Sequence, residues 1–210
     1  MDSLPGKWGN WDNEDFCLAA VRKDGLALRY CKIRTSKLCT TAVMRDGEAL
    51  QYVWRQTPDI CLAAVCRNGL ALAYVHNKTQ LLCIAAVRNN GFALKYVDNT
   101  LQTERLCLDA VRQNGLALQY VLKPTEQICL EAVKQDGRAM LYVPDVLVSE
   151  EICMAAVHQN GLALIDMTDE NRTVAIKQAA MMNYIRNISL QMDQPCSDAT
   201  EDEDILSPIQ

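Results

Sequence analysis

The sequence has few of the residues that build common catalytic and metal sites. It contains two histidines, His76 and His158, and no two cysteines separated by two residues. Because a zinc site needs four converging ligands, usually from such close pairs, we expect no metal ion and no cofactor. There is also no glycine-rich phosphate loop and no pair of catalytic carboxylates. These gaps favour a protein that is not an enzyme.

Long apolar runs are missing as well. Half of the 210 residues are apolar, yet no run approaches the ~20 residues that cross a bilayer, so we expect no membrane contact. Residues Met1 to Trp11 lack the basic and apolar blocks of a secretion signal. The sequence therefore predicts a cytoplasmic protein in a reducing compartment.

A repeat dominates what is present. Ile60 to Val75 reads ICLAAVCRNGLALAYV, and related segments occur seven times. Each copy has a glycine eight residues after its first cysteine, and a fixed period of 22–24 residues indicates a repeat architecture. The repeat cysteines are Cys17, Cys39, Cys61, Cys83, Cys107, Cys129 and Cys153.

Each repeat predicts a hairpin of two short helices. A residue suited to capping a helix N-terminus stands four positions before every repeat cysteine. The apolar residue before the cysteine, the cysteine itself and the Ala-Val pair that follows form one buried helical stripe, as in Leu106 to Val111. We expect Gly, after Asn or Asp, to end this helix in the left-handed conformation. A shorter helix then follows, and stacking of neighbouring hairpins supplies the core. The capping residues are Asn13, Thr35, Thr57, Thr79, Thr103, Thr125 and Ser149.

The sequence therefore predicts an all-α fold: an α-solenoid of seven short helical hairpins with a helical C-terminal cap. Residues 1–12 form an N-terminal cap segment with two tryptophans, and the seven repeats occupy residues 13–167. Residues 168–192 contain a degenerate eighth repeat that caps the array. Residues 193–210 are acidic and expected to be disordered.

Ten cysteines raise the question of disulfide bonds. Stacked helices keep their axes ~8–10 Å apart, whereas a disulfide needs Cα atoms ~4.4–6.8 Å apart. We therefore expect no disulfides and interpret the repeat cysteines as small buried hydrophobic residues. Cys31, Cys66 and Cys196 are expected to be the exposed thiols.

The charge is divided between the repeats and the C-terminal residues. The chain carries −5 and residues 193–210 carry −6, so residues 1–192 carry +1. Cations recur five and six residues after the repeat cysteines, where they form a row along one edge of a stack. Cations at helix C-termini also offset the helix dipole, which is the simpler interpretation of the row. A functional interpretation makes the row a rim for an acidic protein or a phosphate. The candidate partner-binding residues are Arg22, Lys23, Arg45, Arg67, Arg88 and Arg112.

The repeat resembles a known family. Written as Ile/Leu-Cys-Leu-x-Ala-Val-x-x-Asn/Asp-Gly-x-Ala-Leu-x-Tyr-Val, it is similar to the repeats catalogued as domain of unknown function 4116. The likeness covers residues 13–167. It implies an all-helical repeat module without catalytic residues. Such repeats occur in bacteria, including intracellular pathogens, and in some protists and large viruses. The resemblance therefore adds a secreted effector of an intracellular bacterium, acting in the host cytosol, to the expected functions.

We interpret the chain as a non-catalytic protein–protein interaction module, an adaptor or an inhibitor, that binds through one face of the solenoid. Two alternatives stay open. One is an enzyme with an unrecognised cysteine-based site. The other is a helical-repeat binder of single-stranded RNA that uses a row of tyrosines for stacking. The near-neutral charge of residues 1–192 argues against nucleic acid. The tyrosines are Tyr30, Tyr52, Tyr74, Tyr96, Tyr120 and Tyr142.

Overall fold

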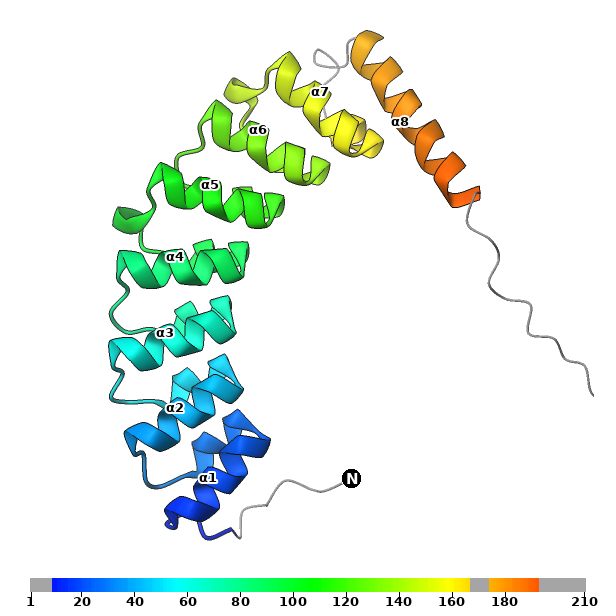
Figure 1. Cartoon of the computed structure of the whole chain (residues 1–210). Helices are drawn as coiled ribbons and strands as arrows, with labels where there is room; N and C mark the ends of the chain where they lie inside the picture. The colour runs from blue at the N-terminus through cyan, green and yellow to red at the C-terminus, as the bar shows by residue number, and fades with distance from the viewer. Residues whose placement is uncertain (1–8, 167–173, 193–210) are drawn as a thin grey trace, which may run out of the picture.

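The computed structural model describes residues 9–166 and 174–192, and every element in these ranges is helical. Each of the seven repeats is a ten-residue α-helix followed by a six-residue 3-10 helix, and α8 closes the array (Figure 1). The predicted α-solenoid with a helical cap is confirmed. The α-helices are α1 Glu14–Lys23, α2 Ser36–Arg45, α3 Pro58–Arg67, α4 Gln80–Asn89, α5 Glu104–Gln113, α6 Glu126–Gln135, α7 Glu150–Gln159 and α8 Val174–Met192.

The second element of each repeat is a 3-10 helix rather than an α-helix. Two of the connections between repeats are two residues longer than the others. Each contains a further 3-10 turn, η5 Asn99–Leu101 or η8 Asp145–Leu147. The stack curves so that connections between repeats lie on its outer side and the C-terminal ends of α1–α7 lie on its inner side (Figure 1). The repeat 3-10 helices are η1 Gly25–Tyr30, η2 Gly47–Tyr52, η3 Gly69–Tyr74, η4 Gly91–Tyr96, η6 Gly115–Tyr120, η7 Gly137–Tyr142 and η9 Gly161–Asp166.

The predicted N-caps are present at the α-helices of all seven repeats, α1 to α7. In α2, for example, the Thr35 hydroxyl accepts a hydrogen bond from the backbone N–H of Leu38 at 3.3 Å. Pro58 occupies the first turn of α3, where its missing N–H has no helical acceptor to lose. These caps satisfy amides that the first turn of a helix leaves without partners. They explain why all seven helices begin at the same position of the repeat.

One Asp or Asn joins the two helices of every repeat. The N–H of Asp24 donates to the Ala20 carbonyl at 3.0 Å and so closes α1. Its carboxylate accepts from the N–H of Leu26 at 2.9 Å and so caps η1. The residue is extended, with φ −142° and ψ 112°. Equivalent bonds recur at the other six junctions, so one short polar residue both ends a helix and begins the next.

The expectation of left-handed glycines is wrong. No glycine in the described ranges has a positive φ. The glycine is needed instead because the next repeat lies against it. A Cβ atom placed on Gly25 would lie 2.5 Å from the Ala42 carbonyl oxygen in α2, and one on Gly47 would lie 2.6 Å from the Ala64 carbonyl oxygen in α3. The missing side chain allows the 3-10 helix of one repeat to contact the α-helix of the next.

The core is the predicted stripe. Every repeat cysteine is buried, as is the Ala-Val pair after it, and the residue before it is buried in six repeats and half-buried, as Phe16, in the first. Neighbouring α-helices pack on each other from α1 through α8. The nine cysteines in the described residues are all free thiols, so the prediction of no disulfides is confirmed for them. Cys196 lies outside the described residues.

Different elements cover the two ends of the stack. Trp11 is buried against the first repeat, with its ring 5.1 Å from that of Phe16 and 5.3 Å from that of Tyr30. At the other end, α8 packs on α7 and η9 and buries Ile176 and Ala180. Trp8, residues 167–173 and the acidic residues 193–210 lie outside the described residues.

Substitutions at Gly115 test the contact between repeats. A Cβ atom there would meet the Ala132 carbonyl oxygen of α6, which belongs to the backbone. Gly115→Ala and Gly115→Asn should therefore both lower the free energy of unfolding, each by about 1–3 kcal/mol, because the contact is overpacked. Urea unfolding measures the change. Gln119→Ala, on the exposed face of the same 3-10 helix, serves as control and should change it by less than about 0.5 kcal/mol. Near-normal stability of Gly115→Asn alone would instead indicate a left-handed turn.

Substitutions at Cys107 test the role of the repeat cysteines. Cys107→Ala should cost ~1–2 kcal/mol, on the low side for a core truncation, because only a sulfur atom is lost. Cys107→Asp should cost far more, because an unpaired charge would be buried. Equal losses in urea unfolding would show that this position is not in the core.

The same thiol should give a pH dependence. Burial, reinforced by the nearby Glu104 carboxylate, raises the pKa of Cys107 from its ordinary 9.0 to about 11. A raised folded-state pKa gives stability that is complete below pH 9 and is lost as the pH rises through about 11. The stability difference between the wild type and Cys107→Ala should therefore shrink from pH 9 to pH 11. A constant difference in urea unfolding would contradict this.

Candidate functional site

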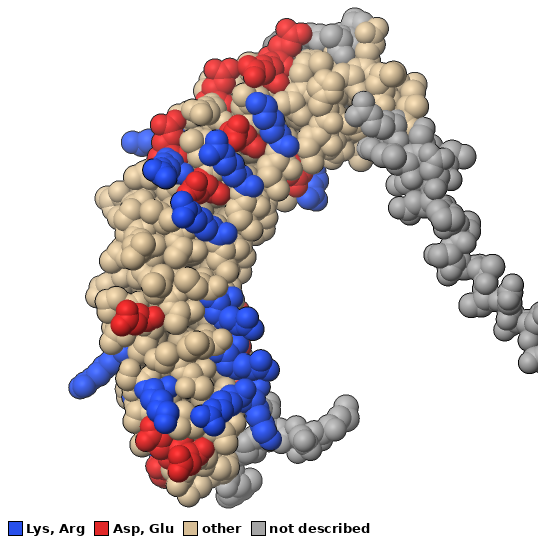
Figure 2. Space-filling model, viewed as in Figure 1, with Lys and Arg blue, Asp and Glu red and all other residues tan. Residues whose placement is uncertain are grey.

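The basic residues singled out in the sequence lie at the C-terminal ends of α1–α5. All six are exposed and stand in the last turn of their helix. Because these ends face the inner side of the curve, the six residues line the concave side of the stack (Figure 1). Figure 2 shows basic side chains gathered along this edge over α1–α3, whereas basic and acidic side chains are interspersed over α5–α7.

Two of the six residues are paired with carboxylates. Arg88 Nε lies 3.4 Å from Asp109 Oδ2, and Arg112 Nε lies 2.8 Å from Glu131 Oε2. The hydrogen bond that Arg112 donates to Glu131 raises the pKa of Arg112 above its ordinary value. Both carboxylates stand two residues after the cysteine of the next repeat. The sequence interpretation grouped the six residues together and missed this pairing, which acidic residues at that position could have revealed.

The other four residues, Arg22, Lys23, Arg45 and Arg67, are here called the basic edge. No carboxylate of a described residue lies within ion-pairing distance of any of them. The residues that stand where Asp109 and Glu131 do are Thr41 in α2 and Ala63 in α3. The basic edge therefore presents cations that are unpaired among the described residues, whereas Arg88 and Arg112 in the next two repeats are each paired with a carboxylate.

Part of the helix-capping interpretation is visible in the structure. Arg45 Nε donates to the Lys23 carbonyl, and Arg67 Nε donates to the Arg45 carbonyl, each at 3.4 Å. Each arginine therefore contacts the end of the preceding helix through one nitrogen. The terminal nitrogens of both guanidinium groups have no acceptor among the described residues. Capping thus uses only the Nε group of each arginine and leaves its two terminal nitrogens for another acceptor.

The later repeats carry amides where the basic edge has Lys23, Arg45 and Arg67. The Gln113 carbonyl oxygen accepts from the backbone N–H of Gly91, and that of Gln135 from the N–H of Gly115, both at 2.5 Å. Asn89 and Gln159 bond to Gly69 and Gly137 in the same way. The sequence interpretation saw only that the charge at this position disappears along the array. The structure gives these amides a role in joining repeats.

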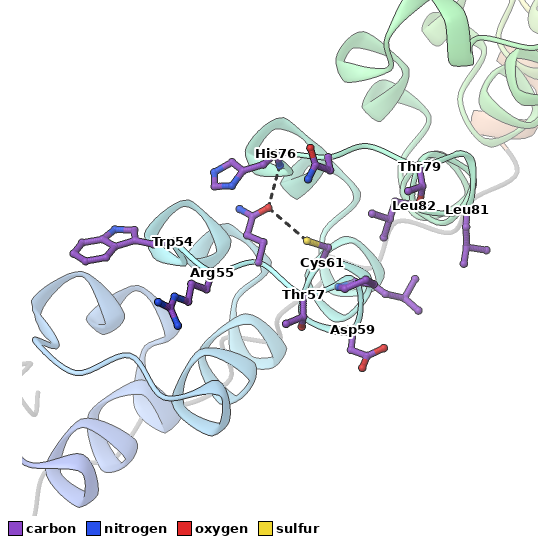
Figure 3. Close-up of a pocket in the computed structure, with 13 residues that line it drawn as sticks. Trp54, Arg55, Thr57, Asp59, Cys61, His76, Thr79, Leu81 and Leu82 are labelled. Atoms are coloured by element: carbon purple, nitrogen blue, oxygen red, sulfur yellow. Dashed lines mark hydrogen bonds between the residues drawn. The ribbon is translucent and has the colours of Figure 1, made fainter.

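A hollow of about 580 Å³ lies on the outer side, between the connections that precede α3 and α4 (Figure 3). Gln56 lines the hollow, and its side-chain oxygen accepts from the backbone N–H of His76 at 3.0 Å and from Cys61 Sγ at 3.5 Å. Burial raises the pKa of the Cys61 thiol, so it stays protonated at neutral pH. The thiol therefore does not provide a ready nucleophile in this hollow.

Four other repeat cysteines give the same result. Burial raises the pKa of Cys129 to about 11, and the repeat thiols Cys39, Cys83 and Cys153 are raised in the same direction. The expectation that Cys31 is exposed is wrong. It is buried in the position that holds Val53 in the second repeat, and burial with contacts to Cys17 raises its pKa to about 12. Cys66 is exposed as expected.

The tyrosine row lies at the edge of the core. Tyr52, Tyr96 and Tyr120 are half-buried against it, while Tyr30, Tyr74 and Tyr142 are 36–41 % exposed. Rings that pack on the core offer little free face for stacking a base.

Two further classes of site were considered. Within residues 9–166 and 174–192, no three His, Cys, Asp or Glu side chains gather where a metal ion could bind. Among the described helices, none has the length and apolar character needed to cross a membrane.

Comparison with known proteins adds a family match. Residues 81–123 and 125–172 match the family model described as Domain of unknown function (DUF4116). No curated protein matches the chain, and no solved structure does. The two matched segments contain the repeats whose α-helices are α4 to α7. Each matched segment spans two of the hairpin repeats, so these residues are similar to two adjacent copies of the DUF4116 domain, and the resemblance inferred from the sequence is confirmed there.

Proposed function

We propose that the chain is a non-catalytic protein–protein interaction module that binds an acidic protein surface through its basic edge. One observation carries this proposal: the four cations of the basic edge have no carboxylate partner among the described residues, while Arg88 and Arg112 do. Cations that served only to balance helix dipoles would not need this difference.

The shape of the array supports the same function. A curved stack of repeats offers an extended concave surface, and solenoid proteins use such surfaces for binding. Four adjacent cations on that surface favour encounter with a partner of opposite charge. We place this binding in the cytoplasm, or in the host cytosol if the chain is a translocated effector.

The two alternative functions have less support. A cysteine-based enzyme needs a thiolate, and burial raises the pKa of the repeat thiols Cys107 and Cys129 to about 11. A binder of single-stranded RNA needs free aromatic faces, and half of the tyrosine row packs on the core. We therefore rank both below protein binding.

The test is cross-linking and pulldown from the native cell, with mass spectrometry to identify the partner. An amine-reactive cross-linker should join Lys23 to the partner and leave Lys134, at the same end of α6, uncoupled. Arg45→Glu combined with Arg67→Glu should weaken binding of the identified partner at least about tenfold and flatten its salt dependence. The melting temperature should change by less than about 2 °C, since both side chains are exposed.

Lys134→Glu is the matched control because it reverses a charge at the end of α6, away from the basic edge. It should leave the affinity within about twofold of the wild type. If the double variant loses stability but keeps its partner, the basic edge is a helix cap and the proposal fails. Equal loss with Lys134→Glu would show a response to net charge alone.

A further inference from the structure

A shallow hollow on the basic edge groups three of its cations. Lys23, Arg45 and Arg67 come from three successive repeats and line a space of about 420 Å³ together with Asp24, Gly25 and Asp46. No one of these side chains belongs to an ion pair within the part of the chain that the structure describes. The hollow is therefore a cluster of cations brought together by stacking.

The hollow has arginines at the positions where later repeats have an Asn or Gln side chain. Five glycine N–H groups, at Gly69, Gly91, Gly115, Gly137 and Gly161, donate to an Asn or Gln side chain of the following repeat. At Gly25 and Gly47 the corresponding residues are Arg45 and Arg67, which have no acceptor atom. Neither N–H has an acceptor among the described residues, although both glycines are buried.

We propose that this hollow binds side-chain carboxylates of an acidic protein segment. One carboxylate oxygen takes the place that an amide oxygen holds in the later repeats, and accepts from the Gly25 N–H. The guanidinium groups of Arg45 and Arg67 and the ammonium group of Lys23 balance its charge. This inference rests on the proposed protein-binding function and names the partner chemistry at its centre.

A carboxylate fits this place for two reasons. Its oxygens have the same planar geometry as the amide oxygen of Gln113, which already bonds to the glycine in the equivalent position. Arginine guanidinium groups also pair with carboxylates through two parallel hydrogen bonds, and the terminal nitrogens of Arg45 and Arg67 have no competing acceptor in the described structure.

Asp24 and Asp46 oppose the binding of an anion, and their bonds limit that effect. Each carboxylate already accepts a hydrogen bond from the backbone two residues on, at 2.9 Å from Leu26 N and 3.0 Å from Glu48 N. With three cations and two aspartates the hollow keeps a net charge of +1. This balance predicts modest affinity for one carboxylate.

Gly47 supplies a second position one repeat away. Packed helices lie ~8–10 Å apart, so the two glycine amides have about this spacing. A polyproline II chain brings every third side chain to the same face after ~9.3 Å. A partner segment with two acidic residues three positions apart therefore matches the two positions.

The test is an NMR titration of the full chain with the peptide acetyl-Pro-Glu-Pro-Pro-Glu-Pro-amide. The amide proton signals of Gly25 and Gly47 should move downfield and saturate, while those of Gly115 and Gly137, which already have acceptors, stay in place. The matched peptide with Gln for both Glu should bind at least about tenfold more weakly, because charge-assisted bonds are lost.

Arg45→Gln gives the sharpest variant. Its amide should bond to the Gly25 N–H as Gln113 does to Gly91, so the peptide dissociation constant should rise at least about tenfold while the melting temperature holds or increases. Lys134→Gln is the matched control and should change the dissociation constant by less than about twofold.

Three results would overturn the carboxylate site. These are unmoved Gly25 and Gly47 signals at saturating peptide, equal binding of the Gln peptide, or unchanged affinity of Arg45→Gln. The outcome is separable from the proposed function. A peptide that binds as predicted, with no native partner at Lys23, would refute the proposed function alone; a partner cross-linked at Lys23, with unmoved glycine signals, would refute the carboxylate site alone.

Discussion

The contact between a glycine of one repeat and an alanine carbonyl of the next is the constraint on which the rest of the structure depends. A Cβ atom at Gly137 would lie 2.6 Å from the Ala156 carbonyl oxygen, and the same approach recurs along the stack. This contact sets how closely the 3-10 helix of one repeat meets the α-helix of the next. It also places the residues at each helix end beside those of the repeat before it. The row of basic residues on the concave side follows from that placement.

The residue six positions after each repeat cysteine then performs either of two tasks. As Asn or Gln, it bonds to the preceding glycine and completes the junction internally, as Gln135 does with Gly115. As Arg, it contacts the preceding helix end through Nε and leaves the glycine N–H of that repeat without an acceptor in the described structure, as Arg45 does beside Gly25. The array thus combines internally completed junctions in later repeats with open, cationic ones in the first. A binding surface can arise in this way without any change to the core.

Most of the fold could be predicted from the sequence because its signals are local. Thr35 and its counterparts cap helices through bonds that span three residues, and the cysteine stripe follows the helical period. The reason for the repeat glycine could not be predicted, because a left-handed turn and a close approach between repeats both require glycine. The burial of Cys31 could have been predicted, since Cys31 stands at the position of the first repeat that Val53 holds in the second. The pairing of Arg88 with Asp109 could have been suspected from an acidic residue two positions after the next cysteine, but the stacking geometry is needed to bring the two side chains together.

The central claim is that Asn or Gln side chains complete the later junctions, while the first two leave their glycine N–H groups without an acceptor among the described residues. Native-state hydrogen exchange of the glycine amides, followed by NMR, tests this claim most directly. An amide that donates to an Asn or Gln side chain should exchange slowly, because the bond must open first. The structure predicts that Gly91, Gly115 and Gly137 exchange at least about tenfold more slowly than Gly25 and Gly47, although all five residues are buried. Equal protection at all five would contradict the claim, since it would mean that the first two junctions have acceptors of their own.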